Sequence, residues 1–350
     1  MKKQLTVVVP AYNAQNYIRK TLDSLCVETT LEDVEVIVVD DGSTDQTGVI
    51  ADQYQSRYPN TVVVIHKANG GHGSGVNCGI CYASGRYFKV VDADDWVDET
   101  AFTNLVSYLR ETDDDAVISG FYWAYDNGSG REETFVRKAE IEEPFPQVRY
   151  RTRYRFDEVA EKLYLKMHGF TLKTAILKEY QIKLDEHCFY VDTEFILYPI
   201  PYIETISFLP DYVYQYRIGR QGQSVSPQQM TRCKGDYDRV LTALLRFYES
   251  CRENCTAEKQ HYIESIIARI VAGKIKVLLS SPAEAARKKE LVDFDHFLKQ
   301  QYSPIYCANR NQAVKVLRLS HYRLYSLAVA ALCAQTRFTA VTWNRTHRRN

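Results

Sequence analysis

The chain has 350 residues, of which 45% are hydrophobic and 25% are charged, and its 44 Lys and Arg residues balance its 44 Asp and Glu residues. This is ordinary globular composition at the length of about two domains, so collagen-like, low-complexity and generally disordered chains are excluded. The charge is unevenly distributed, because residues 296–350 hold nine Lys or Arg and no Asp or Glu. A neutral chain with one basic end predicts a local anionic partner and no nucleic-acid partner.

Alternating strands and helices are predicted over the first third of the chain. Buried strands are predicted for the β-branched runs at 4–9, 34–39, 61–65, 87–91 and 116–119. Helices are predicted, from apolar spacing and capping residues, at 13–27, 45–58, 76–83 and 98–110. This order indicates βαβ units, and therefore an α/β fold with a mostly parallel sheet and helices on both faces. Ligands of such sheets bind beyond the carboxyl ends of the strands.

The pattern changes to a purely helical one near residue 226. Before it, the mixed stretch has strands predicted at 121–125, 133–137 and 212–217 and a short helix predicted at 192–198. After it, helices are predicted at 237–252, 259–279, 283–300 and 312–334. We therefore expect an α/β domain over 1–226 and a helical C-terminal region with a basic tail over 227–350.

No segment predicts secretion or a membrane span. The apolar run from Leu5 to Val9 is too short for a secretory signal and ends at Pro10. No run of about 18 apolar residues occurs. The nine cysteines are scattered, which is typical of a reducing cytoplasm, and the spacing of their two close pairs is only a weak signal for zinc. A cytoplasmic protein is expected.

The usual nucleotide-binding loops do not follow the first predicted strand. A dinucleotide fold would place G-x-G-x-x-G there, and a P-loop would need G-x-x-x-x-G-K-[ST]. Residues 10–13 read Pro-Ala-Tyr-Asn instead. The sequence therefore predicts neither a dinucleotide-binding fold nor a P-loop.

Acidic and glycine-rich segments follow the other predicted strands. Asp92 and Asp94 would project from the same side of an extended segment and could hold a divalent cation, although simple capping is the alternative. Residues 40–43 read Asp-Asp-Gly-Ser, which favours a turn but also offers a carboxylate to the N–H of a uracil ring. The loop 67–75 is either a mobile surface loop or a binding loop. In the second case its glycines let the backbone come close to a phosphate at the N-terminus of the following helix.

Four of these segments together carry a resemblance. They are Val9–Asn13, Val38–Asp45, Lys67–Gly71 and Val91–Trp96. In order and spacing they resemble the family 2 glycosyltransferases of the bacterial cell-envelope type, specifically over 5–97 and more weakly to 226. The resemblance implies a GT-A fold with a nucleotide-binding half over 1–97 and an acceptor half over 98–226. It also implies an inverting enzyme that moves a sugar from a UDP-linked donor to a hydroxyl of a glycan or lipid-linked glycan, with Mg²⁺ or Mn²⁺.

The resemblance also assigns residues to the donor and the metal. Pro10, Ala11 and Tyr12 would cradle the base, and Asp40 would read it. Asp92 would contact the ribose or the bridging phosphate and, with Asp94, ligate the metal. The other donor contacts are expected at Asn13, Asp41, Asn69, Gly70, Gly71, Ser74, Ala93 and Arg217.

A catalytic base is expected before the predicted helix at 192–198. Inversion requires a group that takes the proton of the acceptor hydroxyl as it attacks. In similar proteins this group is the Asp of a Glu-Asp pair, and Asp192 takes that place, although Val191 stands where the Glu is usual. The alternative is that Asp192 caps its helix. Glu194 is the second candidate base.

Two further positions concern the positive charge that would stabilise the diphosphate of the donor. Arg217 with Ser224 resembles the family's Tyr-Arg…Ser segment, in which the basic residue steadies the diphosphate. Many relatives have Ser-Ser-Ala-Arg-Asn after the glycine-rich loop, and the usual Arg is Val76 here. His72 either supplies the missing charge or is an exposed loop residue. A non-catalytic protein that binds sugar nucleotides and a nucleotidyltransferase therefore stay as alternative functions.

The basic tail has an apolar core. Residues 322–334 are apolar apart from Arg323 and one serine, have arginines near both ends and are too short to span a bilayer. Such a segment favours contact with an anionic membrane surface through 310–350, or else packs on its own domain as a terminal helix. The first reading predicts a peripheral protein on the inner face of the cell membrane.

Overall fold

The computed structural model describes residues 3–125, 134–136, 143–218, 233–279 and 285–332. Contacts divide the chain into two compact units, Met1–Gln223 and Ser224–Asn350. Ser224 and the expected boundary at residue 226 lie outside the described residues, as do residues 333–350 of the tail.

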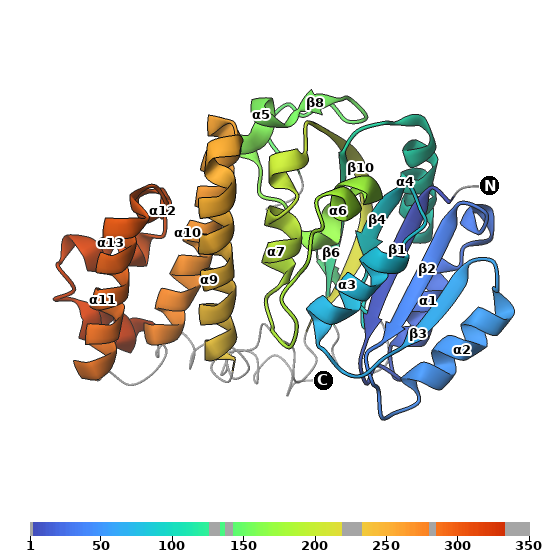
Figure 1. The fold of residues 1–350 in the computed structure, drawn as a ribbon, viewed down its shortest axis with the longest axis horizontal. Coiled ribbons are helices and arrows are strands. Elements are labelled where there is room, and N and C mark those ends of the chain that lie inside the picture. The colour runs from blue at the N-terminus through green and yellow to red at the C-terminus, as the bar shows by residue number, and fades with distance from the viewer. Residues whose placement is uncertain (1–2, 126–133, 137–142, 219–232, 280–284, 333–350) are drawn as a thin grey trace. The chain divides into compact units, whose positions relative to one another are not determined.

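One mixed sheet forms the centre of the first unit (Figure 1). From one edge to the other its strands are β3 (Val62–His66), β2 (Val34–Asp40), β1 (Leu5–Ala11), β4 (Tyr87–Val90), β9 (Phe170–Lys173), β6 (Ala116–Tyr125), β10 (Thr205–Ile218) and β5 (Trp96–Val97). The first four are parallel, as are β6 and β10, whereas β9 runs antiparallel to both of its neighbours. Off this path, β7 (Thr134–Val136) pairs with β6, and β8 (Tyr154–Arg155) pairs with β10.

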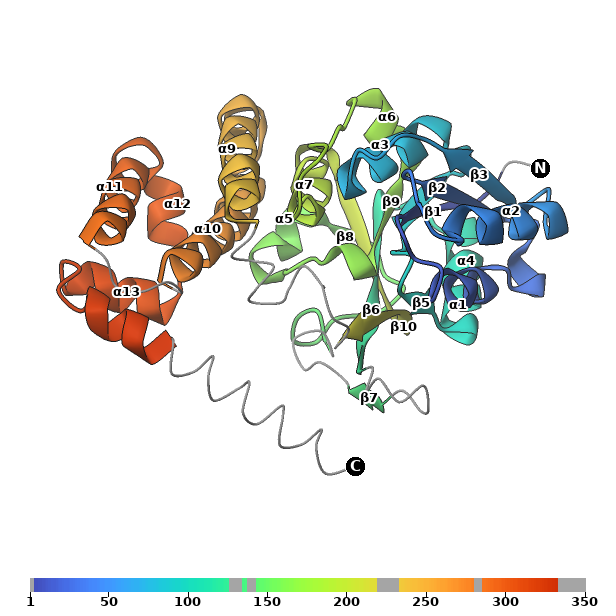
Figure 2. The same ribbon diagram turned by 90° about the horizontal axis from the view of Figure 1, so that it is seen from below.

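Helices cover both faces of this sheet, as predicted. Figure 2 shows α1 (Ile18–Leu25) and α4 (Glu99–Glu111) on one side and α3 (His72–Tyr82) and α6 (Thr174–Glu179) on the other. The cause is β1, which is apolar except for Thr6: its seven residues are all buried and alternate between two faces that both need cover. The remaining helical segments are α2 (Thr47–Arg57), α5 (Phe156–Val159) and α7 (Asp192–Leu197), with short 3₁₀ turns at Glu28–Thr30, Ala160–Lys162, Met167–Gly169 and Ile200–Tyr202.

Close packing of α3 on β1 depends on glycine. A Cβ on Gly79 would lie 2.4 Å from the side chain of Val8, and one on Gly75 would lie 2.9 Å from Pro10. The helix therefore approaches the strand more closely than any larger residue allows. It begins at His72, four residues before the predicted start at 76. This brings the helix N-terminus directly to the glycine-rich loop.

The second unit is helical, as predicted. Its elements are α9 (Lys234–Cys251), a 3₁₀ turn (Arg252–Asn254), α10 (Ala257–Leu279), α11 (Ala285–Gln301), α12 (Ser303–Ala308) and α13 (Gln312–Leu319). The single helix predicted over 312–334 is wrong, because His321 and Tyr322 adopt left-handed backbone conformations after α13. The hydroxyl of Tyr322 donates to the buried carboxylate of Asp295, which also binds Arg318 at 2.7 Å, so the turn serves a buried polar contact.

No described helix combines the length and the apolar character that crossing a membrane requires.

Candidate active site

Asp41 organises the glycine-rich loop. Its carboxylate accepts hydrogen bonds from the backbone N–H of Gly70 at 2.9 Å and of Gly71 at 2.7 Å, and it pairs with Lys67 Nζ at 2.7 Å. Its own carbonyl accepts from the side chain of Asn69 at 2.9 Å. Asp41 is 3% exposed, so it shapes the loop from within. The predicted donor residues 69–71 are thereby brought together with the end of β2.

Asp40 lies at the carboxyl end of β2 and is buried. It accepts a hydrogen bond from the backbone N–H of Ser43 at 3.0 Å and lies 2.8 Å from His66 Nδ1. The hydrogen bond to Asp40 raises the pKa of His66, and a second contact, to Asp52, acts in the same direction. These contacts fix the orientation of the carboxylate that is expected to read the base.

The end of β1 is tied to the same turn. Asn13 has a left-handed φ of 49°, and its side-chain oxygen accepts from the N–H of Thr44 at 2.8 Å. Tyr12 leaves 53% of its surface exposed beside these residues. An exposed aromatic face next to a fixed carboxylate can stack on a planar base.

A histidine stands at the start of α3. His72 Nε2 lies 2.8 Å from Asp92 Oδ1. Burial acts to lower the pKa of His72, but the charge of Asp92 and this hydrogen bond outweigh it, with further charge from Asp192 and Asp94, and the pKa is raised. Val76, in place of the usual Arg, is fully buried in α3. His72, at the start of the same helix, pairs with Asp92 where the usual Arg side chain is absent.

The turn that follows β4 depends on Asp95, which is not among the site residues predicted from the sequence. Asp95 is 1% exposed and accepts hydrogen bonds from the Tyr214 hydroxyl at 2.6 Å and the Arg217 N–H at 2.7 Å. Burial, followed by the charges of Asp94 and Asp92, raises its pKa well above the ordinary value. Its only sequence signal is its place directly after the Asp92–Asp94 pair.

His168 also lies at this site, and no motif in the sequence pointed to it. It belongs to the 3₁₀ turn that precedes β9, and its ring packs against Phe121, Tyr214 and Tyr216 at centroid distances of 4.9, 4.8 and 4.4 Å. Its carbonyl accepts from the buried Lys89 Nζ at 2.7 Å. Burial lowers the pKa of His168 to about 4, so its imidazole is neutral near pH 7.

Asp92, Asp95 and His168 form the one group among the described residues that could hold a metal ion. Their ligand atoms all lie within 4.8 Å of one another. Carboxylate oxygens and a neutral imidazole are a suitable donor set for a divalent cation, and His168 Nδ1 is buried with no hydrogen-bond partner. Asp94 is not in this group, although its charge acts on Asp95 and His72.

Arg217 is built into the wall of the site. It is 7% exposed, and its guanidinium lies over the rings of Trp96 at 4.9 Å and Tyr17 at 5.1 Å. Its Nε donates to the carbonyl of Asp94 at 2.9 Å. These contacts hold the turn after β4 in place and keep a positive charge beside it.

Asp192 and Glu194 have different surroundings. Asp192 is the first residue of α7 and is exposed. Desolvation by the protein atoms that crowd its carboxyl raises its pKa, while the charges of Lys166 and His72 act in the opposite direction. Glu194 is 0% exposed, and its carboxylate accepts from the N–H of Asp185 at 2.8 Å. Of these two carboxylates, only that of Asp192 belongs to an exposed residue.

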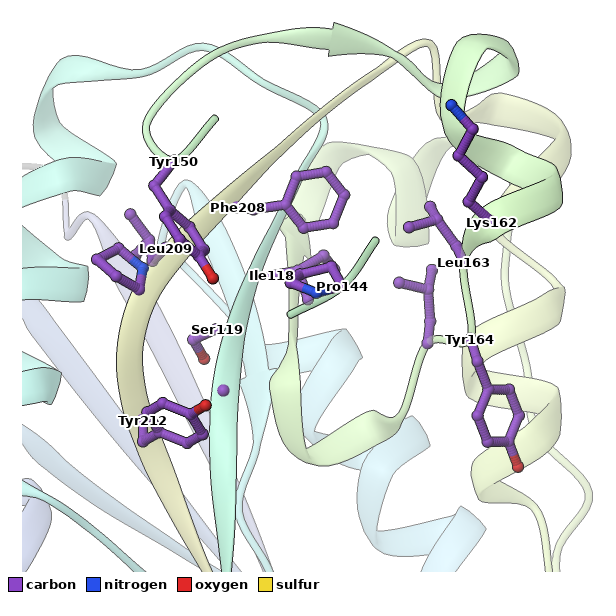
Figure 3. Close-up of a pocket in the computed structure, with 13 residues that line it drawn as sticks. Ile118, Ser119, Pro144, Tyr150, Lys162, Leu163, Tyr164, Phe208, Leu209 and Tyr212 are labelled. Atoms are coloured by element: carbon purple, nitrogen blue, oxygen red, sulfur yellow. The ribbon is translucent and has the colours of Figure 1, made fainter. Parts of the chain in front are cut away.

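A separate cavity of about 110 Å³ lies between β6, β10 and the loop from Pro144 to Tyr150 (Figure 3). Tyr164, Phe208 and Tyr212 contribute to its lining. Ligand pockets for drug-sized molecules are usually about 300 Å³ or more. This cavity contains none of the predicted site residues and is too small for a nucleotide sugar.

These features define a class of protein. An α/β sheet carries fixed carboxylates, a glycine-rich loop and an acidic turn at the carboxyl ends of β2, β3 and β4. The family model named glycosyl transferase family 2 matches residues 6–181. The chain belongs to this family, which confirms the resemblance.

The chain is also similar to individual relatives, and its fold is similar to that of a solved structure. The chain is 31% identical over 227 residues to a poly(ribitol-phosphate) beta-glucosyltransferase of Bacillus spizizenii, covering 64% of this chain and 33% of the relative. It is 39% identical over 131 residues to the glycosyltransferase GlyG of Streptococcus pneumoniae, covering 37% and 42%. The structure of S. aureus TarS residues 1–349 in complex with UDP-GlcNAc matches with a TM-score of 0.65 at 20% identity, covering 96% and 92%. The chain spans less than half the length of these two curated relatives.

Proposed function

We propose that the chain transfers a sugar from a UDP-linked donor to a hydroxyl group of a cell-envelope polymer, with inversion at the sugar carbon. The observation that carries this proposal is the geometry at the strand ends of a chain that belongs to glycosyltransferase family 2: Asp41 holds the glycine-rich loop at 2.9 and 2.7 Å, and His72 pairs with Asp92 at 2.8 Å. The charges of His72 and Asp92 also act on the pKa of the Asp192 carboxyl. Asp92 follows β4, and Asp192 begins α7, 100 residues further along the chain. Two relatives support the chemistry, since one was solved with UDP-GlcNAc and the other is named for poly(ribitol-phosphate).

Asp192 is the proposed base. The acceptor oxygen forms a bond to the sugar's anomeric carbon, the bond from that carbon to the diphosphate oxygen breaks, and UDP leaves. The proton of the acceptor hydroxyl passes to Asp192. A raised pKa makes its carboxylate a stronger base than an ordinary Asp. Glu194 is fully buried and engaged by Asp185, so we propose no catalytic role for it.

Asp92, Asp95 and His168 would hold Mg²⁺ or Mn²⁺, with Asp94 beside them. A divalent cation bound there would neutralise charge on the departing diphosphate. His72 would supply a further positive charge in place of the arginine that Val76 replaces. Asp40 and Tyr12 would bind the base, and the loop from Lys67 to Gly71 would approach the phosphates with its backbone.

The test is thermal unfolding with UDP and with GDP, each with and without Mn²⁺, followed by UDP release from a panel of UDP-sugars. A ligand stabilises the fold by about 2.7 kcal/mol at 100 times its Kd. We expect a UDP shift that needs Mn²⁺ and is lost in Asp94→Ala and His168→Ala. The exposed Asp113→Ala is the matched control. No shift with UDP, or binding without any UDP release, would favour the non-catalytic alternative.

We also propose that the second unit contacts an anionic membrane surface. Val316, Leu319 and Leu327 leave 48%, 82% and 66% of their surfaces exposed, and the exposed cations Lys315 and Arg323 lie on the same stretch. Apolar side chains beside cations fit the interface of an anionic bilayer.

Vesicle flotation tests this surface. The protein should float with phosphatidylglycerol vesicles and not with phosphatidylcholine vesicles, and Leu319→Asp with Leu327→Asp should abolish flotation. Val49→Asp, at an exposed position in the first unit, is the control. Flotation that is equal on both lipids, or unchanged in the double variant, contradicts the proposal.

A further inference from the structure

Asn77 joins two distant parts of the chain. It lies on α3, and its side-chain amide pairs with both backbone groups of Leu184, donating to the carbonyl at 2.9 Å and accepting from the N–H at 2.8 Å. The same amide donates to Glu186 Oε1 at 3.2 Å. The two segments are 107 residues apart in sequence. The side chain thus satisfies both backbone groups of a residue that lies outside the regular strands.

Glycines allow the two segments to approach further. A Cβ on Gly73 would lie 2.1 Å from the carbonyl oxygen of Asp185, and one on Gly71 would lie 3.3 Å from the backbone of His187. The N–H of His187 donates to the carbonyl of Gly70 at 2.5 Å. The glycine-rich loop and the segment 184–188 are therefore in direct backbone contact.

The contact continues from this segment to Asp192. The N–H of Asp185 donates to Glu194, which is fully buried in α7, and Asp192 is the first residue of the same helix. His187 and Tyr190 adopt left-handed φ values of 52° and 69°. Such conformations cost about 1 kcal/mol or more for residues other than Gly, so surrounding contacts must impose them.

We propose that Asn77 is a positioning residue that holds the segment leading to Asp192 against the glycine-rich loop. The donor loop and the base then keep one relative position, which is what attack on the sugar carbon requires. This inference rests on the proposed function for the role of Asp192. The attachment of residues 184–188 to α3 is independent of the proposed function.

The test compares Asn77→Ala with Asn104→Ala. Asn104 also joins segments 107 residues apart, through a 2.7 Å hydrogen bond to Asp211, but it has no contact with the proposed site. Three quantities are measured: UDP affinity with Mn²⁺, UDP release from UDP-GlcNAc, and hydrogen exchange of residues 184–190. Asn77→Ala should lower kcat by about 10- to 100-fold, because a displacement of about 1 Å has effects of that size. Exchange of 184–190 should rise while UDP affinity stays within about threefold of wild type.

A pair of compensating variants distinguishes a positioning role of Asn77 from a general effect on folding. Asn77→Asp keeps the acceptor for Leu184 but places a carboxylate against Glu186, and adding Glu186→Gln restores a donor to that contact. The double variant should regain part of the kcat that Asn77→Asp loses. Asn104→Ala should lower the melting temperature without either effect.

Unchanged exchange at 184–190, or equal losses in kcat and UDP affinity in Asn77→Ala, would overturn the inference. Asp192→Asn is measured beside them. If it keeps the wild-type rate, the base assignment fails, and the exchange data still decide whether Asn77 holds the segment.

Discussion

The donor loops and the base segment of the first unit are held together in different ways. Donor-loop contacts join residues close in sequence: Asp41 binds Gly70 and Gly71 across 29 and 30 positions, and Asn13 binds Thr44 across 31. On the base side, Asn77 reaches Leu184 across 107 positions. The acidic turn after β4 also depends on a distant contact, because Arg217 reaches Asp95 across 122 positions.

This difference shows which parts of the site are self-contained. The donor loops fold from consecutive βα units, each of which ends at the same edge of the sheet. The segment 184–188, which leads to Asp192, lies outside the regular strands and is held by contacts with Asn77 and Gly70 of the donor half. Removing donor-loop contacts should therefore weaken binding and stability, whereas removing base-side contacts should slow the reaction.

The largest expected effect is at the base. Asp192→Asn should lower kcat by about 10²- to 10⁴-fold, the usual contribution of general-base catalysis, and leave UDP affinity unchanged. Because the pKa of Asp192 is raised, the wild-type rate should fall with decreasing pH at a higher pH than for an ordinary Asp. UDP release across pH measures both.

Glu194→Gln is the matched variant. It keeps an oxygen for the N–H of Asp185 and should retain most of the rate, while Glu194→Ala should chiefly destabilise the fold. A larger loss in Glu194→Gln than in Asp192→Asn would reverse the two assignments.

Asp41 gives the next effect. Asp41→Ala leaves the N–H groups of Gly70 and Gly71 and the ammonium of Lys67 without this acceptor, and should lower the free energy of unfolding by about 3 kcal/mol. UDP affinity should fall with it, because the loop loses its internal anchor. Urea unfolding measures the free energy of unfolding, and titration calorimetry measures the UDP affinity. The exposed Asp113→Ala should change stability by less than about 1 kcal/mol, and equal effects of both variants would contradict the special role of Asp41.

The sequence predicted the donor half because its signals are local. Asp40 and Asp41 stand at the end of β2, Gly70 lies in the loop after β3, and their order alone indicates a shared edge. His168 could not be predicted, since a lone His between Met167 and Gly169 has no local pattern, and its place depends on where β9 begins between β4 and β6. The same holds for Asp95, whose burial depends on Tyr214 and Arg217 far along the chain.

Lys89 links the two halves and gives a pH-dependent effect. It is fully buried on β4, and burial lowers its pKa to about 7. Above that pH the folded protein releases a proton that the unfolded chain still binds, so stability rises with pH up to the unfolded pKa. The free energy of unfolding of wild type relative to Lys89→Met should therefore increase by about 2 kcal/mol between pH 7 and pH 9. A constant difference would mean that Lys89 titrates normally.

The smallest expected effect is at Asp98, where the acceptor half begins. Its side chain caps α4 by accepting the N–H of Ala101 at 2.9 Å, a contact across three residues that the sequence predicted. Asp98→Ala should lower the free energy of unfolding by about 1 kcal/mol, and Asp98→Asn by less, since Asn also caps helices. Neither should change UDP release, because the cap holds only the helix start. A change in kcat comparable to that of Asn77→Ala would show that any loosening of this half displaces Asp192, and the proposed division between local and distant contacts would then fail.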